Sequence, residues 1–298
     1  MTVSILRKAF FRVYPPRNLV FFLQRQVMHS VSRARLADLA CRRLPAAVHD
    51  KTEVLDRGVA DLERDGYVML PGLAQNTEID DILRYLADKP VYDRWKPTSG
   101  TFDANHPPPE CHTALYRDAD VVNCPHVLRW ANDPRVLAIV GPMLGAKPTI
   151  SNLTIWWSYP GHDTPQEAEN FHRDVDDLRF VKLFVYLTEV DEGCGPHAFV
   201  PGSHRRPEFL KIRRYTDAEV EQAFGRDGIK HFTGSRGSSF LENTFGLHKG
   251  QLPATGRRLL FQAQYSLHPI GIYDYRPARR TLEEGFVPDP YINRLFVK

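Results

Sequence analysis

The spacing of apolar residues changes at Pro148, and this change constrains the fold more than any other feature of the chain. Before Pro148, the segments 79–87 and 127–144 repeat apolar residues at helical spacing. After it, shorter segments rich in β-branched and aromatic residues predict strands at 150–159, 181–190, 197–200 and 258–265. Helices followed by antiparallel strands predict an α+β fold, with a double-stranded β-helix core (a cupin-like jelly roll) and N-terminal helices packed on it.

The composition is that of a soluble protein with a substantial core. The chain has 298 residues, of which 42% are hydrophobic and 25% are charged. Its four cysteines form no Cys-x-x-Cys pair and no even ladder of spacings, so neither a zinc ribbon nor a disulfide framework is indicated. We therefore expect a cytoplasmic protein with a leader over residues 1–45 and a single jelly-roll domain over residues 46–298.

The first 45 residues differ from the remainder in charge. They carry nine basic residues against one acidic residue, a net charge of +8, which leaves −5 for the rest of a chain whose net charge is +3. Apolar residues lie between the arginines, as in interfacial helices, but the apolar run 19–23 is too short to span a bilayer. Two interpretations stay open: the leader binds an anionic membrane surface, peripherally on the inner membrane, or it packs on the body of the protein.

Residues 90–124 are rich in Pro, Asp, Asn and His, with three consecutive prolines at 107–109. This composition predicts a long irregular loop, and loops of that size often cover active sites.

The triplet His172-Arg173-Asp174 is the first sign of a specific chemistry. Residues two apart on an extended strand project from the same face, so this imidazole and this carboxylate can bind one ion together. They would supply two of the three protein ligands of a non-haem iron site, with a histidine from elsewhere as the third. In a chain with 12 histidines and 36 acidic residues, composition alone yields on the order of one such triplet, so the neighbouring sequence must decide.

That neighbouring sequence is a strand over 182–190, a Gly-rich turn over 193–196, a short strand, and the turn Val200-Pro201-Gly202-Ser203-His204. The arrangement resembles the phytanoyl-CoA dioxygenase family of oxygenases that depend on Fe(II) and 2-oxoglutarate. The resemblance, from about residue 65 to residue 265, implies that His172 and Asp174 bind Fe(II). It also implies 2-oxoglutarate and O2 as cosubstrates, and it admits ascorbate as an auxiliary.

The third ligand is sought among the remaining histidines. His248 precedes a short loop and the basic and then apolar strand that begins at Arg257, an order that matches the distal ligand and the cosubstrate-binding arginine of the family. We therefore expect the metal ligands to be His172, Asp174 and His248, with His268 as a distant second choice. In His197 and His204 we expect hydrogen-bonding residues of the turn.

A guanidinium suits the far carboxylate of 2-oxoglutarate, because it is permanently charged and donates two parallel hydrogen bonds. Arg258 is favoured by the family register, and Arg257 stays open because neighbouring strand residues face opposite ways. Where relatives often carry Gly-Ser after the distal histidine, this chain has Lys249 and Gly250, so other cosubstrate contacts are not assigned. Lys182 is a polar candidate for such a contact, although exposure at a strand edge is the expected explanation for it.

The resemblance also implies a reaction class. Family halogenases have a small residue in place of the carboxylate ligand, so Asp174 favours hydroxylation over halogenation. Basic residues near the triplet and in the leader suggest an anionic substrate, and the chain is similar to bacterial Kdo 3-hydroxylases, which oxidise a sugar acid of lipopolysaccharide. The alternatives are a hydroxylase of a soluble metabolite or natural-product intermediate and a catalytically silent binding module. No nucleic-acid partner is expected, because the chain has no recognisable reader motif.

Overall fold

A computed structural model describes residues 16–47, 53–280 and 282–298, and its strands form two antiparallel sheets. The strands are β1 (Tyr67–Met69), β2 (Val91–Asp93), β3 (Thr101–Phe102), β4 (Thr113–Tyr116), β5 (Thr149–Ser158), β6 (Phe180–Tyr186), β7 (His197–Phe199), β8 (Lys230–Phe232), β9 (Ser239–Glu242), β10 (His248–Gly250) and β11 (Arg258–Ser266). The α-helices are α2 (Pro16–Gln24), α3 (Ser30–Cys41), α4 (Glu53–Asp65), α5 (Asn76–Leu86), α6 (Asp118–Asn123), α7 (Val127–Ala131), α8 (Pro134–Leu144) and α9 (Asp217–Phe224). Short 3₁₀ turns lie at Pro97–Ser99, Glu167–Glu169, Glu192–Cys194, Ser203–Arg205 and Arg226–Gly228.

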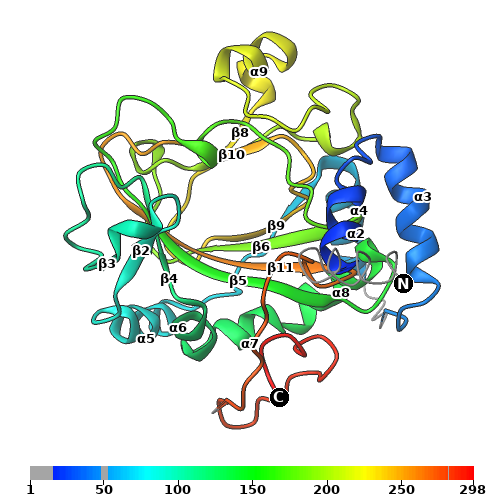
Figure 1. The fold of residues 1–298 in the computed structure, drawn as a ribbon, viewed down its shortest axis with the longest axis horizontal. Helices are drawn as coiled ribbons and strands as arrows, with labels where there is room; N and C mark the ends of the chain where they lie inside the picture. Colours follow the sequence, from blue (N-terminus) through cyan, green and yellow to red (C-terminus); the bar gives the residue numbers. More distant parts are fainter. Residues whose placement is uncertain (1–15, 48–52, 281) are drawn as a thin grey trace, which may run out of the picture.

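The two sheets form the expected jelly roll. The major sheet has eight strands in the order β1-β9-β6-β11-β5-β4-β2-β3, and the minor sheet has the order β10-β7-β8. In Figure 1 the minor sheet lies above the major sheet, and α5 to α8 lie below it. The prediction of an α+β fold with a jelly-roll core and helices packed on it is therefore confirmed.

Side chains alternate on the central strand β11, which pairs with β5 on one side and β6 on the other. Leu259, Phe261 and Ala263 belong to the large core between the major sheet and the helices. On the opposite face, Leu260 packs in a smaller aromatic cluster between the two sheets, and Arg258 faces the same interior. Because the side-chain period of a strand is two, one strand both builds the core and lines the space between the sheets.

Two predictions about local structure were wrong. The helix expected over 127–144 is two helices, since Asp133 caps α8 by accepting a hydrogen bond from the Arg135 amide at 2.8 Å, and Pro134 begins its first turn. The segment 90–124, expected to be a loop, contributes β2, β3, β4 and α6. These strands have two to four residues, too few to show an alternating pattern, and they form because β4 pairs with β5 at the sheet edge.

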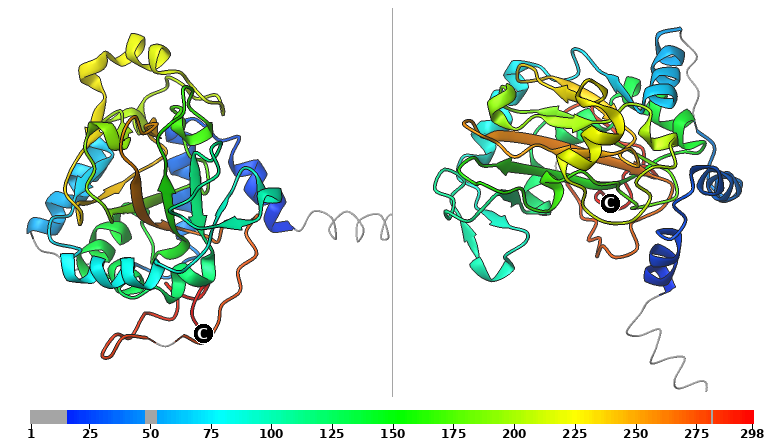
Figure 2. Two further views of the ribbon diagram at one scale, coloured as in Figure 1. Left: turned by 90° about the vertical axis from the view of Figure 1, so that its left-hand side faces the viewer. Right: turned by 90° about the horizontal axis from the view of Figure 1, so that it is seen from above.

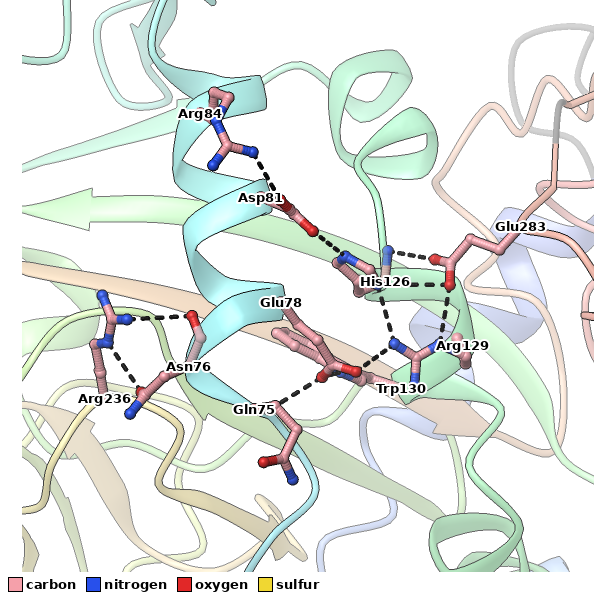
Figure 3. A network of polar contacts seen from close by, with 10 residues as sticks. All are labelled: Gln75, Asn76, Glu78, Asp81, Arg84, His126, Arg129, Trp130, Arg236 and Glu283. Atoms are coloured by element: carbon pink, nitrogen blue, oxygen red, sulfur yellow. Dashed lines mark hydrogen bonds and ion pairs between the residues drawn. The ribbon is translucent and has the colours of Figure 1, made fainter.

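A network of charged and polar side chains fastens α5 to α7 and to the C-terminal segment (Figure 3). Arg129 donates to Glu78 at 2.5 Å and to Glu283 at 2.9 Å, and the Trp130 indole N–H donates to Glu78 at 2.9 Å. The network therefore joins α5, α7 and the C-terminal segment to one another in the layer that lies below the major sheet in Figure 1.

The N-terminal helices α2 and α3 lie beside the ends of the two sheets (Figures 1 and 2). Phe21, Arg33 and Ala37 are buried against the body of the protein. The opposite faces expose large apolar side chains: Leu19, Val20, Phe22, Leu23, Val31, Leu36 and Leu39. The first part of the leader, residues 1–15, lies outside the described residues. Among the residues that are described, we find no helix with the length and apolarity needed to cross a membrane.

Candidate metal centre

His172 and His248 face each other across an isolated antiparallel bridge that extends the minor sheet. Each donates its backbone N–H to the carbonyl of the other, at 2.9 and 3.0 Å. Two residues further along, the Asp174 amide donates to the Thr244 carbonyl at 2.9 Å. This backbone pairing brings residues 172–174 against residues 244–248, so three side chains that are distant in sequence converge on one point.

Both imidazole rings are oriented by the carbonyl two residues before them. Nδ1 of His172 lies 2.9 Å from the carbonyl oxygen of Asn170, and Nδ1 of His248 lies 3.0 Å from that of Gly246. A carbonyl oxygen can only accept, so each Nδ1 carries the proton and each Nε2 presents its lone pair. Such partners fix the tautomer that a metal-binding histidine needs.

The three side chains are spaced as ligands of one ion. Nε2 of His172 lies 3.6 Å from Oδ1 of Asp174, and Nε2 of His248 lies 3.3 Å from Oδ2 of Asp174. All the candidate ligand atoms lie within 4.8 Å of one another. Two imidazoles and one carboxylate on one side of a site, with open space on the other, suit Fe(II) in oxygenases. The donor set therefore fits a mononuclear iron.

Lys182 lies beside this cluster and is buried, contrary to the expectation that it is exposed at a strand edge. Its Nζ contacts Oδ2 of Asp174 at 2.6 Å and lies 3.6 Å from Asp176. Burial opposes ionisation of Asp174, but the pKa of this carboxyl is lowered, and the positive charge of Lys182 is the largest effect that lowers it. Lys182 thus keeps Asp174 in the anionic form that binds a metal.

A cavity of about 500 Å³ opens beside the cluster, between the two sheets. The inward face of β11 forms its floor through Leu260, Gln262 and Gln264, and Arg258 lies at one end of the row. The cavity is mixed in character, because aromatic and aliphatic side chains alternate there with amides and charged groups. Such a cavity can take a small molecule with several hydrogen-bonding groups.

The two candidate arginines differ in burial and in their contacts. Arg258 is 2% exposed, donates to the Gly195 carbonyl, and lies 3.3 Å from the Ser158 hydroxyl, with its Nε unpartnered. No carboxylate of the described residues forms an ion pair with it. Arg257 faces outward over the Trp157 ring, with its guanidinium carbon 4.4 Å from the ring centroid. A Cβ at Gly250 would lie 2.9 Å from Nη2 of Arg258, so the glycine at this position leaves room for the guanidinium.

The other candidate histidines lie away from the cluster or behind it. His268 contacts Asp177 at 3.2 Å and is not among the converging ligands. His204 hydrogen-bonds the Glu63 carbonyl at 3.0 Å, in the turn where we expected it. His197 lies on β7 rather than in a turn, with its ring centroid 5.5 Å from that of His248.

His197 also pairs with Glu242, a buried carboxyl that sequence reasoning missed. Nε2 of His197 lies 2.9 Å from Oε2 of Glu242, and burial raises the pKa of Glu242 to about 8. The signal that could have identified Glu242 is its place on the inward face of β9. A strand of four residues is too short to show in sequence which side chains face inward. The pair packs behind His248 and supports its ring.

A jelly roll that carries two histidines and one carboxylate around an interior cavity defines a class of enzymes, the non-haem iron oxygenases that use 2-oxoglutarate. Residues 62–250 match the sequence profile of the family described as phytanoyl-CoA dioxygenase (PhyH), which is more than half of the chain. The chain belongs to this family and is a dioxygenase that depends on iron and 2-oxoglutarate.

Solved structures share the fold at low sequence identity. HygX from Streptomyces hygroscopicus, with nickel, 2-oxoglutarate and hygromycin B bound, is 18% identical over 77% of this chain and 92% of its own, with a TM-score of 0.52. EctD from S. alaskensis, with bound Fe, is 19% identical over 85% and 92%, with a TM-score of 0.51. The epimerase SnoN, in complex with Fe3+, alpha ketoglutarate and nogalamycin RO, is 21% identical over 80% and 97%, with a TM-score of 0.52. No curated protein sequence matches the chain significantly.

Proposed function

We propose that His172, Asp174 and His248 hold Fe(II), that Arg258 anchors 2-oxoglutarate, and that the enzyme hydroxylates an unactivated C–H bond of an anionic sugar or glycolipid. One observation carries the proposal: the metal-ligand cluster and a buried arginine without a carboxylate partner line the same cavity. A buried charge needs an opposite charge to be stable, and a bound dicarboxylate would supply it.

Each of these residues has its own role in binding the metal or the cosubstrate. His172 and His248 present neutral Nε2 atoms to the metal, and Asp174 contributes one carboxylate oxygen while Lys182 contacts the other. Arg258, whose Nε has no partner, would donate to the distal carboxylate of 2-oxoglutarate. When bound, iron and 2-oxoglutarate supply the oxidising chemistry, in which decarboxylation to succinate and carbon dioxide accompanies transfer of one oxygen atom to the substrate.

The cavity wall supports a polar, anionic substrate. Amide and hydroxyl side chains of its wall can bind several substrate hydroxyl groups: Asn152, Thr154, Gln262 and Gln264 on the major sheet, and Tyr273 in the segment after β11. Arg25 and Arg94 also line it, and neither forms an ion pair with a described carboxylate, whereas Arg213 and Arg214 are paired with Glu219 and Glu167. A sugar acid such as Kdo, or a glycolipid that carries one, combines hydroxyl groups with a negative charge.

A soluble small molecule is the second candidate substrate. The cavity has the volume of a small-molecule site, and HygX and SnoN, which share the fold, bind hygromycin B and nogalamycin RO. A catalytically silent module, by contrast, does not agree with the family assignment and the converging cluster of His172, Asp174 and His248.

The exposed apolar face of α2 and α3 supports peripheral association with an anionic membrane. Seven large apolar side chains are exposed over residues 19–39, in the most basic part of the chain. An amphipathic helix with this character binds an interface through apolar burial and attraction to anionic lipid. Because α2 also reaches the cavity through Phe21, a membrane at this face would bring a glycolipid near the site. In this proposal residues 1–45 are the membrane-facing leader and residues 46–298 the oxygenase domain.

Turnover tests the reaction. Purified protein with Fe(II), O2 and 2-oxoglutarate should release succinate, and Asp174→Ala should lower the rate at least about a hundredfold, because one of three ligands is lost. Mass spectrometry of lipopolysaccharide and metabolite extracts from cells with and without the gene should find a product heavier by one oxygen. Full succinate release by Asp174→Ala would refute the metal assignment, and a product of unchanged mass would refute hydroxylation.

Vesicles test the membrane proposal. The full-length protein should sediment with vesicles of anionic phosphatidylglycerol, and less of it should sediment as salt rises. Replacing Val20 and Leu23, both exposed on α2, with serine should weaken sedimentation, since apolar burial is lost. Salt-insensitive sedimentation, or equal sedimentation with neutral vesicles, would contradict the proposal.

A further inference from the structure

The segment from Phe21 to Arg33 packs against the loop that carries the metal ligands. It precedes the residues that match the family, so family membership does not account for its contacts. Figure 2 shows the blue helices α2 and α3 at the end of the sheets, and the contacts below join them to the chain that follows Asp174.

Two polar side chains fasten the segment. Gln24 donates from Nε2 to the Val175 carbonyl at 2.8 Å, one residue beyond the proposed ligand Asp174. Arg33 is 3% exposed and donates to the carbonyl of Val27 at 3.0 Å and to that of Asp177. Its guanidinium thus joins the N-terminal segment to the loop after Asp174.

Arg33 also contacts the second loop that leads to a ligand. Its guanidinium carbon lies 4.6 Å from the centroid of the Phe245 ring, three residues before His248. An arginine that is buried among carbonyl groups and an aromatic face is rigid, because its planar donors fix its orientation. One side chain therefore spans both segments whose register brings His172, Asp174 and His248 together.

The same segment forms part of the cavity wall. Phe21 is buried and lines the cavity, and Arg25 lies over its ring with the guanidinium carbon 5.1 Å from the centroid. Arg25 lines the cavity as well and is partly exposed, without an ion pair to any described carboxylate. An apolar ring beside an unpaired cation is suited to a ligand with an apolar edge and a negative charge.

We propose that residues 21–33 are a working part of the active site: Arg33 is a positioning residue for the metal-binding loops, and Phe21 and Arg25 form a subsite for an anionic group of the primary substrate. The subsite rests on the proposed function, because it assumes that the primary substrate enters this cavity. The positioning role does not depend on the substrate. The anionic group is a carboxylate or a phosphate, since a guanidinium binds both.

Metal binding tests the positioning role. Arg33→Leu should raise the dissociation constant for Co(II), followed by its visible absorption, about tenfold, as loss of an outer contact to a metal site does. It should also speed hydrogen exchange at the Asp174 amide. Arg33→Lys, which keeps the charge, should restore part of both, and Arg35→Leu, an exposed position on the same helix, should change neither. A folded Arg33→Leu protein with unchanged Co(II) affinity and exchange would overturn the positioning role. If Arg33→Leu does not fold, Arg33→Lys is compared with wild type instead, and unchanged Co(II) affinity and exchange in that variant would overturn the role.

Charged and neutral probes test the subsite. Kdo, its methyl ester, glucose 6-phosphate and glucose are titrated into the enzyme loaded with Co(II) and 2-oxoglutarate. Wild type should prefer an anion to its neutral counterpart, and the pair that shows the preference distinguishes carboxylate from phosphate. Arg25→Gln should lose about tenfold of this preference, the value of one charge-assisted hydrogen bond, whereas Arg35→Gln should keep it.

The outcomes separate the two proposals. If wild type prefers anions and Arg25→Gln prefers them equally, the subsite is wrong and the proposed substrate class stands. If wild type shows no preference with either pair, the proposed substrate class and the role of Arg25 both fail, and the Arg33 measurements alone decide whether the segment positions the metal loops.

Discussion

At the scale of single residues, Arg258 and Arg257 differ in surroundings although they are neighbours in sequence. Arg258 is buried in the cavity and Arg257 lies over Trp157 on the outer face. We predict that Arg258→Gln raises the KM for 2-oxoglutarate about 30- to 100-fold, since a pair of charge-assisted hydrogen bonds is worth about 2–3 kcal/mol. Arg257→Gln should change it less than about twofold. Steady-state kinetics of both variants measures this, and the reverse order would assign the anchor to Arg257.

His204 makes stability depend on pH. Burial lowers the pKa of His204 to about 4, although the Glu63 carbonyl accepts its Nε2 hydrogen. Between pH 6.5 and 4 the unfolded chain therefore binds a proton that the folded protein does not, so the folded state loses stability as the pH falls through this window. The loss should reach about 2 kcal/mol between pH 7 and pH 5.

Urea unfolding at both pH values measures the contribution of His204. His204→Gln keeps a donor for the Glu63 carbonyl but does not titrate, so its stability should fall about 2 kcal/mol less than that of wild type. His231→Gln, at an exposed position on β8, is the matched control for removing an imidazole. Equal losses in wild type and His204→Gln would contradict the prediction.

Some of the site could be predicted from single residues and some could not. His172 and Asp174 share one face of an extended segment, so their spacing predicts that both can bind one ion. Lys182 and Glu242 gave no such signal, because their burial depends on the pairing of β6 with β9 across the sheet, where they are opposite each other. Cross-strand register is set by the whole sheet and cannot be read from either strand alone.

At the scale of elements, the cap of α8 shows how two residues divide one predicted helix. Asp133 accepts from the Arg135 amide at 2.8 Å and also pairs with its exposed guanidinium at 3.1 Å. We predict that Asp133→Ala lowers the free energy of unfolding by about 1 kcal/mol, the value of an N-cap. Asp133→Asn keeps the cap and loses only a surface ion pair, so it should cost less than about 0.5 kcal/mol. Urea unfolding of both variants checks this, and equal losses would assign the effect to the ion pair.

Long elements could be predicted because their apolar residues repeat several times. α5, β5, β6 and β11 each lie close to their predicted positions. The strands β3, β8 and β10 have two or three residues and exist only because a partner strand offers hydrogen bonds. β10 carries His248, so the element that completes the cluster is one that local pattern could not show.

At the scale of the whole molecule, the candidate metal centre links the two sheets in addition to the aromatic cluster between them. His248 belongs to the minor sheet, and Asp174 lies in the loop that leads into β6 of the major sheet and contacts Lys182 on that strand. The large core packs the major sheet against helices, whereas the minor sheet contributes to the smaller clusters. We therefore expect the stability of the minor sheet to depend more on a bound ion than that of the major sheet.

This dependence leads to a prediction for metal removal. A metal that binds only the folded state stabilises it by about 2.7 kcal/mol at a concentration a hundred times its dissociation constant. Chelation should therefore lower the Tm of the holoenzyme, and hydrogen exchange should accelerate in β7, β8 and β10 more than in β5, β6 and β11, because local opening begins where least apolar area is buried. Asp174→Ala should show the fast exchange of the minor sheet with or without metal, since the link through the carboxylate is gone. Uniform acceleration across both sheets would mean instead that the ion stabilises the molecule as one cooperative unit.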